Sequence, residues 1–138
     1  MKAKISKNIH GVTLVETMAA ILVFGLVAVG MLDVCAQSMV MGKRAELSYT
    51  ANNLAKNHLE TLKSIPFSSL TSAAETDTRV DSLGVPDEDG VFKRNTTVTT
   101  SYSSDANLVR LTVTVDYQVK KVFSGNPVSI STVVFQYA

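Results

Sequence analysis

Glu16 is the only carboxylate in an otherwise apolar stretch, which makes it the first candidate for a chemical role in this sequence. The stretch runs from Val12 to Leu32 and holds no other charge and no proline, so a helix is the expected conformation. With about 20 residues, this helix has the length needed to cross the hydrocarbon core of a bilayer. A carboxylate in such a segment is costly and is, by default, a functional residue that needs a partner. We therefore expect a membrane-spanning helix in which Glu16 has a role beyond anchoring.

A short basic segment precedes this stretch and ends at Gly11. Its only Lys, Arg, Asp or Glu residues are Lys2, Lys4 and Lys7. Under the positive-inside rule, this end stays in the cytoplasm and the C-terminal part of the chain is exported. The order Gly11-Val12-Thr13-Leu14-Val15-Glu16, followed at once by the apolar run, resembles the cleavage and methylation site of type IV prepilins.

This resemblance implies a defined processing pathway. Residues 1–11 would be a leader peptide that a prepilin peptidase removes after Gly11, and the peptidase would then methylate the new amino group of Val12. Glu16, now the fifth residue, would pair with the cationic N-terminus of a neighbouring subunit, because a buried carboxylate without a partner is costly. The expected partners are the prepilin peptidase, other pilins or pseudopilins, and the inner membrane.

The segment from Asp33 to Lys63 continues the helical pattern and becomes amphipathic. Apolar residues three and four positions apart form one face of this helix. They are Leu47, Ala51, Leu54, Ala55, His58, Leu59 and Leu62. Pro66 is expected to stop the helix, because a proline biases the preceding residue out of the helical region. One long helix is therefore predicted over residues 12–64, with residues 12–32 as its membrane-spanning and assembly part.

Residues 65–138 are predicted to form an antiparallel β domain of three to four strands. Ser68–Gly90 is dense in turn-forming residues and is predicted to be a loop. Three strands are predicted to follow it, over Val91–Ser101, Leu108–Lys120 and Val128–Tyr137. In the second of these, apolar and polar residues alternate, which indicates a strand with one buried and one solvent-exposed face. The residues of its apolar face are Val109, Leu111, Val113, Val115, Tyr117 and Val119.

The apolar faces of the helix and of the strands can bury each other. The sequence therefore predicts an α+β fold in which a long N-terminal helix packs on a small antiparallel sheet. This order is that of the pilin fold implied by the resemblance. The solitary Cys35 cannot form an internal disulfide. The compact sheet, the missing cysteine loop and the ending VTVDY…VSIST are most similar to minor pilins of the PilV type.

The remaining residues that could act in catalysis or bind a metal ion are not expected to form a catalytic or metal site. His58 is the only histidine after the leader and has no second histidine or cysteine near it, so it is expected to pack under the sheet. Asp87, Glu88 and Asp89 could offer oxygens to calcium, but three adjacent acids cannot all converge on one ion, and a solvated turn is expected. We expect a structural subunit with no cofactor and no enzymatic activity.

Charge argues against nucleic acid as a direct partner. Without the three leader lysines, 10 of the 13 basic residues remain against 12 acidic ones, a net charge of −2. No basic stripe is left that could follow a phosphate backbone.

Two other interpretations of the N-terminal region remain open. Val34-Cys35-Ala36 fits the small-residue rule of ordinary signal peptidase, and cleavage after Ala36 would release a secreted, soluble β-domain protein. An uncut leader would instead leave a plain single-pass membrane protein. The prepilin interpretation places the chain in the inner membrane and then in a pilus or pseudopilus, as a minor pilin or a pseudopilin. Such subunits serve pilus biogenesis, adhesion, motility, secretion or DNA uptake.

Overall fold

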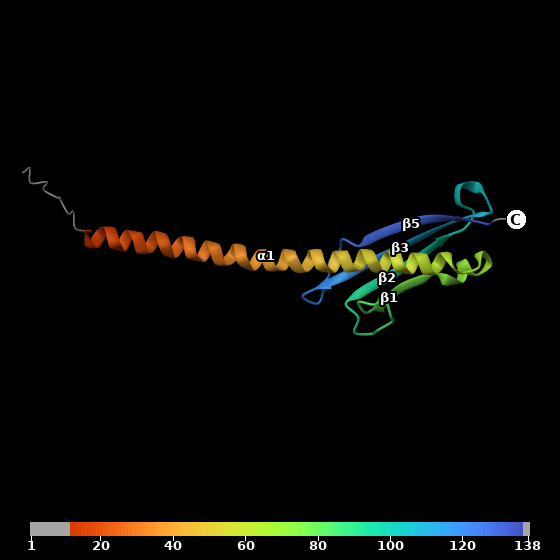
Figure 1. The fold of residues 1–138 in the computed structure, drawn as a ribbon, viewed down its shortest axis with the longest axis horizontal. Coiled ribbons are helices and arrows are strands. Elements are labelled where there is room, and N and C mark those ends of the chain that lie inside the picture. The colour runs from red at the N-terminus through yellow and green to blue at the C-terminus, as the bar shows by residue number, and fades with distance from the viewer. Residues whose placement is uncertain (1–11, 137–138) are drawn as a thin grey trace, which may run out of the picture. The chain divides into compact units, whose positions relative to one another are not determined.

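The computed structural model describes residues 12–136 and has an α+β architecture (Figure 1). Its elements in chain order are α1 (Leu14–Lys63), the 3₁₀ segment η1 (Phe67–Ala73), β1 (Glu75–Val80), β2 (Phe92–Thr99), the 3₁₀ segment η2 (Tyr102–Ser104), β3 (Leu108–Val119), β4 (Val122–Phe123) and β5 (Val128–Phe135). The predicted fold class, a long N-terminal helix and a small antiparallel sheet, is confirmed.

α1 contributes to two compact units, Met1–Met41 and Gly42–Ala138. In the second unit, the helix has one apolar face that is buried in the core. The buried residues of this face are Ala51, Leu54, Ala55, Leu59 and Leu62. All five belong to the face that the three- and four-residue spacing predicts. The helix ends at Lys63, three residues before Pro66, which cannot supply the backbone N–H that a helix interior needs.

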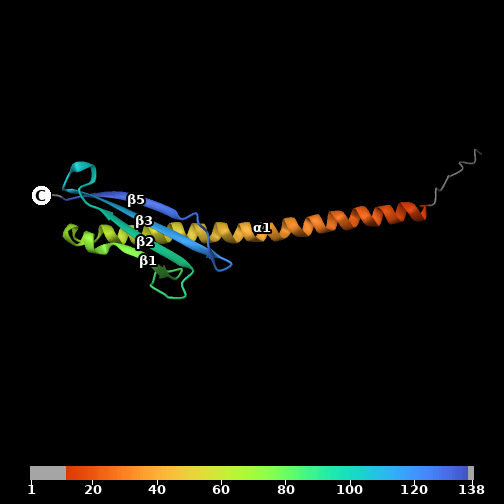
Figure 2. The ribbon, with the colours of Figure 1, turned by 180° about the vertical axis from the view of Figure 1, so that it is seen from behind.

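The sheet is antiparallel throughout, and β3 is its central strand. The strand order is β1-β2-β3-β5, and the two-residue β4 pairs with the last residues of β3. β3 and β5 are in register over eight residue pairs, from Leu108↔Phe135 to Val115↔Val128, without a bulge. The reverse view shows the same four long strands side by side (Figure 2). β1 and β5 therefore form the two edges of the sheet.

The core lies between the C-terminal half of α1 and one face of the sheet (Figure 1). The alternation predicted for β3 is confirmed, because the residues of its apolar face from Val109 to Tyr117 are at most 8% exposed. Phe92 from β2, Val80 from β1 and Leu70 from η1 complete the buried cluster. The helix residues and the sheet residues belong to one buried cluster, so the two elements cover each other's apolar faces.

The prediction of a loop over Ser68–Gly90 is wrong in part, because this region contains η1 and the edge strand β1. β1 has the sequence ETDTRV, and Val80 is its only fully buried residue. Since five of its six residues are polar or charged, no apolar periodicity reveals the strand. Its pairing with β2 and the ion pair of Glu75 hold it in the sheet.

Candidate functional site

The N-terminal end of α1 is stabilised by a side-chain cap. The Glu16 N–H donates a hydrogen bond to Thr13 Oγ1 at 3.3 Å, and the Thr17 N–H donates to the Thr13 carbonyl at 3.1 Å. Thr13 thus accepts from one of the first N–H groups of the helix, which have no partner within the helix. Glu16 itself lies in the first turn, where a negative charge interacts favourably with the helix dipole.

Glu16 borders a shallow hollow on one face of the part of α1 that lies in the first unit of the chain. The hollow is lined by Glu16, Ala19, Ala20, Val23, Phe24 and Val27. These residues recur at helical spacing, so they form a single stripe that starts at the carboxylate. Two adjacent alanines next to Glu16 leave room for another helix to approach closely, as small residues do at helix contacts in membranes.

The first unit of α1 is apolar and exposed. Among the described residues, α1 is the one helix whose length and composition would allow it to cross a membrane. Val12 is 68% exposed, and large apolar side chains such as Leu22, Phe24 and Leu26 are all at least 70% exposed. α1 also runs without a break through Ala36, the residue before the alternative cleavage point. Gly11, the predicted end of the leader, lies outside the described residues.

A polar cluster connects α1 to β1 and β2 beneath the sheet. Arg94 from β2 is almost fully buried, and its Nε and Nη2 atoms donate to the two carboxylate oxygens of Glu75 at 2.8 and 3.2 Å. Arg94 Nη1 also donates to the carbonyl of Gly84 at 3.3 Å. A guanidinium held by both oxygens of one carboxylate is the strong, bidentate form of this ion pair. The pair joins neighbouring strands, because Glu75 belongs to β1.

His58 is the α1 member of this cluster. Its Nε2 lies 3.2 Å from Thr96 Oγ1 and 3.7 Å from Glu75 Oε2, and the side chain is 15% exposed. Burial lowers the pKa of His58 below its usual value, and the nearby Arg94 guanidinium lowers it further. Glu75 opposes these two effects. His58 therefore packs under the sheet as predicted, in surroundings that favour its neutral form.

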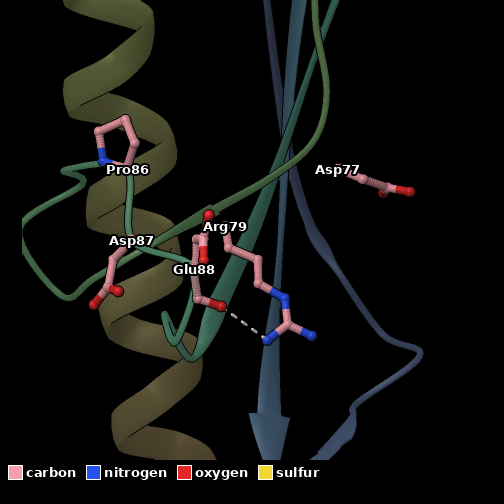
Figure 3. Close-up of a pocket in the computed structure, with 5 residues that line it drawn as sticks. All are labelled: Asp77, Arg79, Pro86, Asp87 and Glu88. Carbon is pink, nitrogen blue, oxygen red and sulfur yellow. Dashed lines mark hydrogen bonds between the residues drawn. The ribbon is translucent and has the colours of Figure 1, made fainter.

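The acidic loop after β1 lies beside a shallow pocket lined by Asp77, Arg79, Pro86, Asp87 and Glu88 (Figure 3). The Asp77 and Asp87 side chains point away from each other in this view, and Arg79 Nη1 donates to the Glu88 carbonyl at 3.2 Å. Asp87 accepts from the N–H of Asp89, which closes a turn. Within residues 12–136, no group of three His, Cys, Asp or Glu side chains is placed to hold a metal ion. Asp87 and Asp89 thus form the exposed turn that the sequence predicts.

Two features of the site were not identified from the sequence. The spacing Thr13-x-x-Glu16 is a known signal of a capped helix start, so the role of Thr13 could have been found. The Arg94–Glu75 pair could not, because it joins residues 19 positions apart and one of them lies in a strand with no apolar pattern. Cys35 is exposed and free, as expected of a single cysteine.

Comparison with known proteins supports the assignment of the N-terminal segment and of nothing beyond it. Residues 6–32 match the family described as prokaryotic N-terminal methylation motif. The match includes Gly11, Val12 and Glu16, and it ends at Leu32, the predicted end of the membrane-spanning part. No curated protein and no solved structure gives a significant match. The chain thus carries the N-terminal segment of type IV pilin-like prepilins, attached to a β domain that these comparisons do not classify.

Proposed function

We propose that this chain is a structural subunit of a type IV pilus or a related pseudopilus, made as a prepilin and assembled through α1. Its leader, residues 1–11, is removed after Gly11, and the amino group of Val12 is methylated. Residues 12–64 form the helix that anchors the subunit and packs it into the assembly, and residues 65–138 form the exported β domain. The chain is the substrate of the processing reactions and not their catalyst.

The observation that carries this proposal is the coincidence of the methylation motif with the start of an exposed apolar helix. The motif covers residues 6–32, and α1 begins at Leu14, two residues after the proposed new N-terminus. A soluble protein would have to bury the exposed apolar side chains that α1 carries in its first unit. A bilayer covers them before assembly, and neighbouring helices cover them afterwards.

Glu16 gives this helix its specificity in assembly. The carboxylate stands at the end of the stripe that continues through Ala19, Ala20 and Val23. A second helix that packs on this stripe can bring its methylated, cationic N-terminus to Glu16. Two charges that leave water together must pair, because either one alone would be strongly unfavourable in the interior.

Among pilus subunits, we place this chain with the minor pilins of the PilV type, with a secretion pseudopilin as the second candidate. The small five-stranded sheet and the single free cysteine support this choice, because no disulfide-closed loop extends the domain. The subunit is held in the inner membrane with its C-terminal domain outside the cytoplasm, and it then enters the filament or the complex that initiates it.

The mass and N-terminal sequence of the mature protein test this proposal. We expect a chain that begins at Val12 and is one methyl group heavier than its sequence. A chain that begins at Gln37 would instead support the secreted β-domain protein, and an intact Met1 would support the plain single-pass protein.

A Gly11→Leu variant should remain uncut, because the peptidase must approach the backbone at this position and only a very small residue permits this. Gly11→Ala is the matched control and should be cut slowly. Normal cleavage of Gly11→Leu would contradict the proposed site.

A further inference from the structure

The two edges of the sheet differ in how open they are to a further strand. At the β1 edge, the register shifts between Glu75 and Thr78, and Asp77 has a positive φ of 51°. The following loop folds back over this edge, because Asp87 N–H donates to the Arg79 carbonyl and Val80 forms a bridge with Pro86. A bulge, charged side chains and a covering loop are the features by which proteins prevent pairing at a sheet edge.

Within residues 12–136, the β5 edge has none of these protections from Val128 to Val134. Its sequence, VSISTVVF, contains no charge, glycine or proline, and it pairs with β3 over eight residues without a register shift. Four of these residues are β-branched valine or isoleucine, and the strand is long for an edge. A regular, uncharged edge strand is a template for pairing with another chain.

The hydrogen bond next to the C-terminal end of β5 shows which backbone groups of β5 are not used in pairing with β3. The Gln136 N–H donates to the Asn107 carbonyl, so position 136 faces β3. Orientation alternates along an antiparallel strand, so the N–H and C=O groups of Ser129, Ser131 and Val133 face away from β3. In the described part of the chain, β3 is the one strand that pairs with β5. Three residues thus offer alternating donors and acceptors along the open edge.

We propose that the β5 edge binds an edge strand of a different pilin-type subunit, which runs antiparallel to β5 and continues the sheet. This inference rests on the proposed function, because it takes the neighbour to be anchored in the same direction. In this fold, β1 and β5 are antiparallel to each other, since three antiparallel pairings separate them. A neighbour of the same topology and the same orientation therefore presents its first strand in the direction that β5 requires.

A second copy of this chain fits the β5 edge less well. Its own β1 edge is closed by the bulge at Asp77 and by the loop after Val80. Pairing of β5 with β5 is antiparallel only when the two copies run in opposite directions, whereas subunits anchored by α1 in one membrane run in the same direction. The open edge and the closed edge together make this subunit suited to one neighbour on its β5 side.

The test uses the full-length chain in its host, with Ser131→Pro as the blocking variant and Ser131→Ala as its matched control. Proline removes the outward N–H of residue 131, and edge strands tolerate it because that N–H does not serve the ladder to β3. Alanine removes the side chain and keeps the N–H. We expect Ser131→Pro to lower co-purification of pilin-type subunits about tenfold, the effect of one or two lost hydrogen bonds. Ser131→Ala should match the wild type.

A photo-crosslinking residue at position 133 provides a second measurement that does not depend on how the proline variant folds. Crosslinks from position 133 should map to an edge strand of a different subunit that carries an N-terminal methylation motif. The same residue placed at Leu83, which is 83% exposed on the loop after β1, should not give this product. Crosslinks to a helix, to a loop, to another copy of this chain, or to no pilin-type subunit would overturn the inference, as would wild-type co-purification of a stably folded Ser131→Pro chain.

Leader cleavage separates this inference from the proposed function. A chain that is cut after Gly11 but forms no β5 contact refutes the docking edge alone. A chain that is not cut refutes the proposed function itself.

Discussion

Arg94 on β2 binds both carboxylate oxygens of Glu75 on β1, with the Nε–Oε2 distance at 2.8 Å and the Nη2–Oε1 distance at 3.2 Å. This ion pair is the main side-chain link between the edge strand and the sheet, because β1 has only Val80 fully buried. Without it, β1 would depend on its backbone pairing to β2, which the register shift near Asp77 interrupts, and on the contacts of Asp77 with Lys93 and Asn95. The pair therefore contributes to holding β1 in the sheet.

Glu75→Gln should destabilise the β domain by about 1–3 kcal/mol, because it leaves the buried Arg94 guanidinium without its counter-charge. The matched control is Glu60→Gln, which breaks the exposed ion pair with Lys63 and should cost less than about 1 kcal/mol. Urea unfolding of a chain that begins at Gly42 measures both. Equal effects of the two substitutions would show that the buried pair has no special weight.

The stability of the β domain should fall as the pH drops below about 6.5, the usual pKa of histidine. His58 has a lowered pKa in the folded chain, so between that pKa and about 6.5 the unfolded chain binds more protons. The stability therefore rises with pH through this window, and above about 6.5 the contribution of His58 has its full value. Arg94, Glu75 and Thr96 are the groups that face His58 from β2 and β1.

His58→Gln removes the titrating group and should flatten this part of the stability profile. Thermal melts at several pH values between about 5 and 7.5 compare the variant with the wild type. An unchanged slope in His58→Gln would assign the pH dependence to the carboxylates instead.

Burial explains which parts of this fold could be predicted from the sequence. β3 was predictable because Val109, Leu111 and Val113 alternate with polar residues, and the structure buries all three. The helix was predictable because its apolar spacing continues to Leu62 and a proline follows. In both elements, the side chains that face the core are apolar, so the pattern of side chains reports the pattern of burial.

β1 and the polar cluster could not be predicted from the pattern of apolar side chains. Glu75 and Arg94 are held in the structure by each other, and neither residue type marks a buried position. His58 was expected beneath the sheet, but its partners Glu75 and Thr96 come from strands that approach only in the folded chain. Long-range polar contacts leave no periodic signal in the sequence, so they appear only in the three-dimensional structure.

The two faces of β3 provide a test of the sheet assignment. Val113→Asp places an unpaired charge in the core and should destabilise by about 3 kcal/mol or more, since Val113 is fully buried. Thr112→Asp, on the opposite face, should change stability by less than about 0.5 kcal/mol. Thermal melts of the chain that begins at Gly42 give both values. Similar losses would mean that the faces are assigned wrongly.

Gly90 should tolerate no side chain, although its φ is not in the left-handed region. A Cβ atom there would clash with the Val80 carbonyl oxygen, which belongs to the paired backbone of β1. Gly90→Ala should therefore destabilise by about 1–3 kcal/mol, the usual range for overpacking. Gly42→Ala is the control, because nothing lies within 4 Å of its Cβ position and alanine favours a helix by about 0.5–1 kcal/mol. A neutral Gly90→Ala would show that the loop moves away without cost.

Glu16 should matter for assembly and not for insertion or leader cleavage. Glu16→Ala removes a carboxylate from the apolar segment, so membrane insertion should be at least as efficient as in the wild type. The cap of the helix should persist, because Thr13 Oγ1 accepts from the backbone N–H of residue 16 and not from its side chain. Under the proposed function, however, the methylated amine of a neighbouring Val12 would lose its counter-charge in the assembly.

Removal of one partner from a buried pair leaves the other charge uncompensated. The Glu16→Ala chain should therefore accumulate in the membrane with its leader removed and be depleted about tenfold or more from sheared filaments or from complexes with other pilins. Glu16→Gln should behave similarly, because it keeps the shape of the side chain and loses its charge. Glu46→Ala, which removes an exposed carboxylate farther along α1, is the matched control and should assemble normally. Recovery of Glu16→Ala in the assemblies at the wild-type level would mean that the carboxylate serves only the start of the helix.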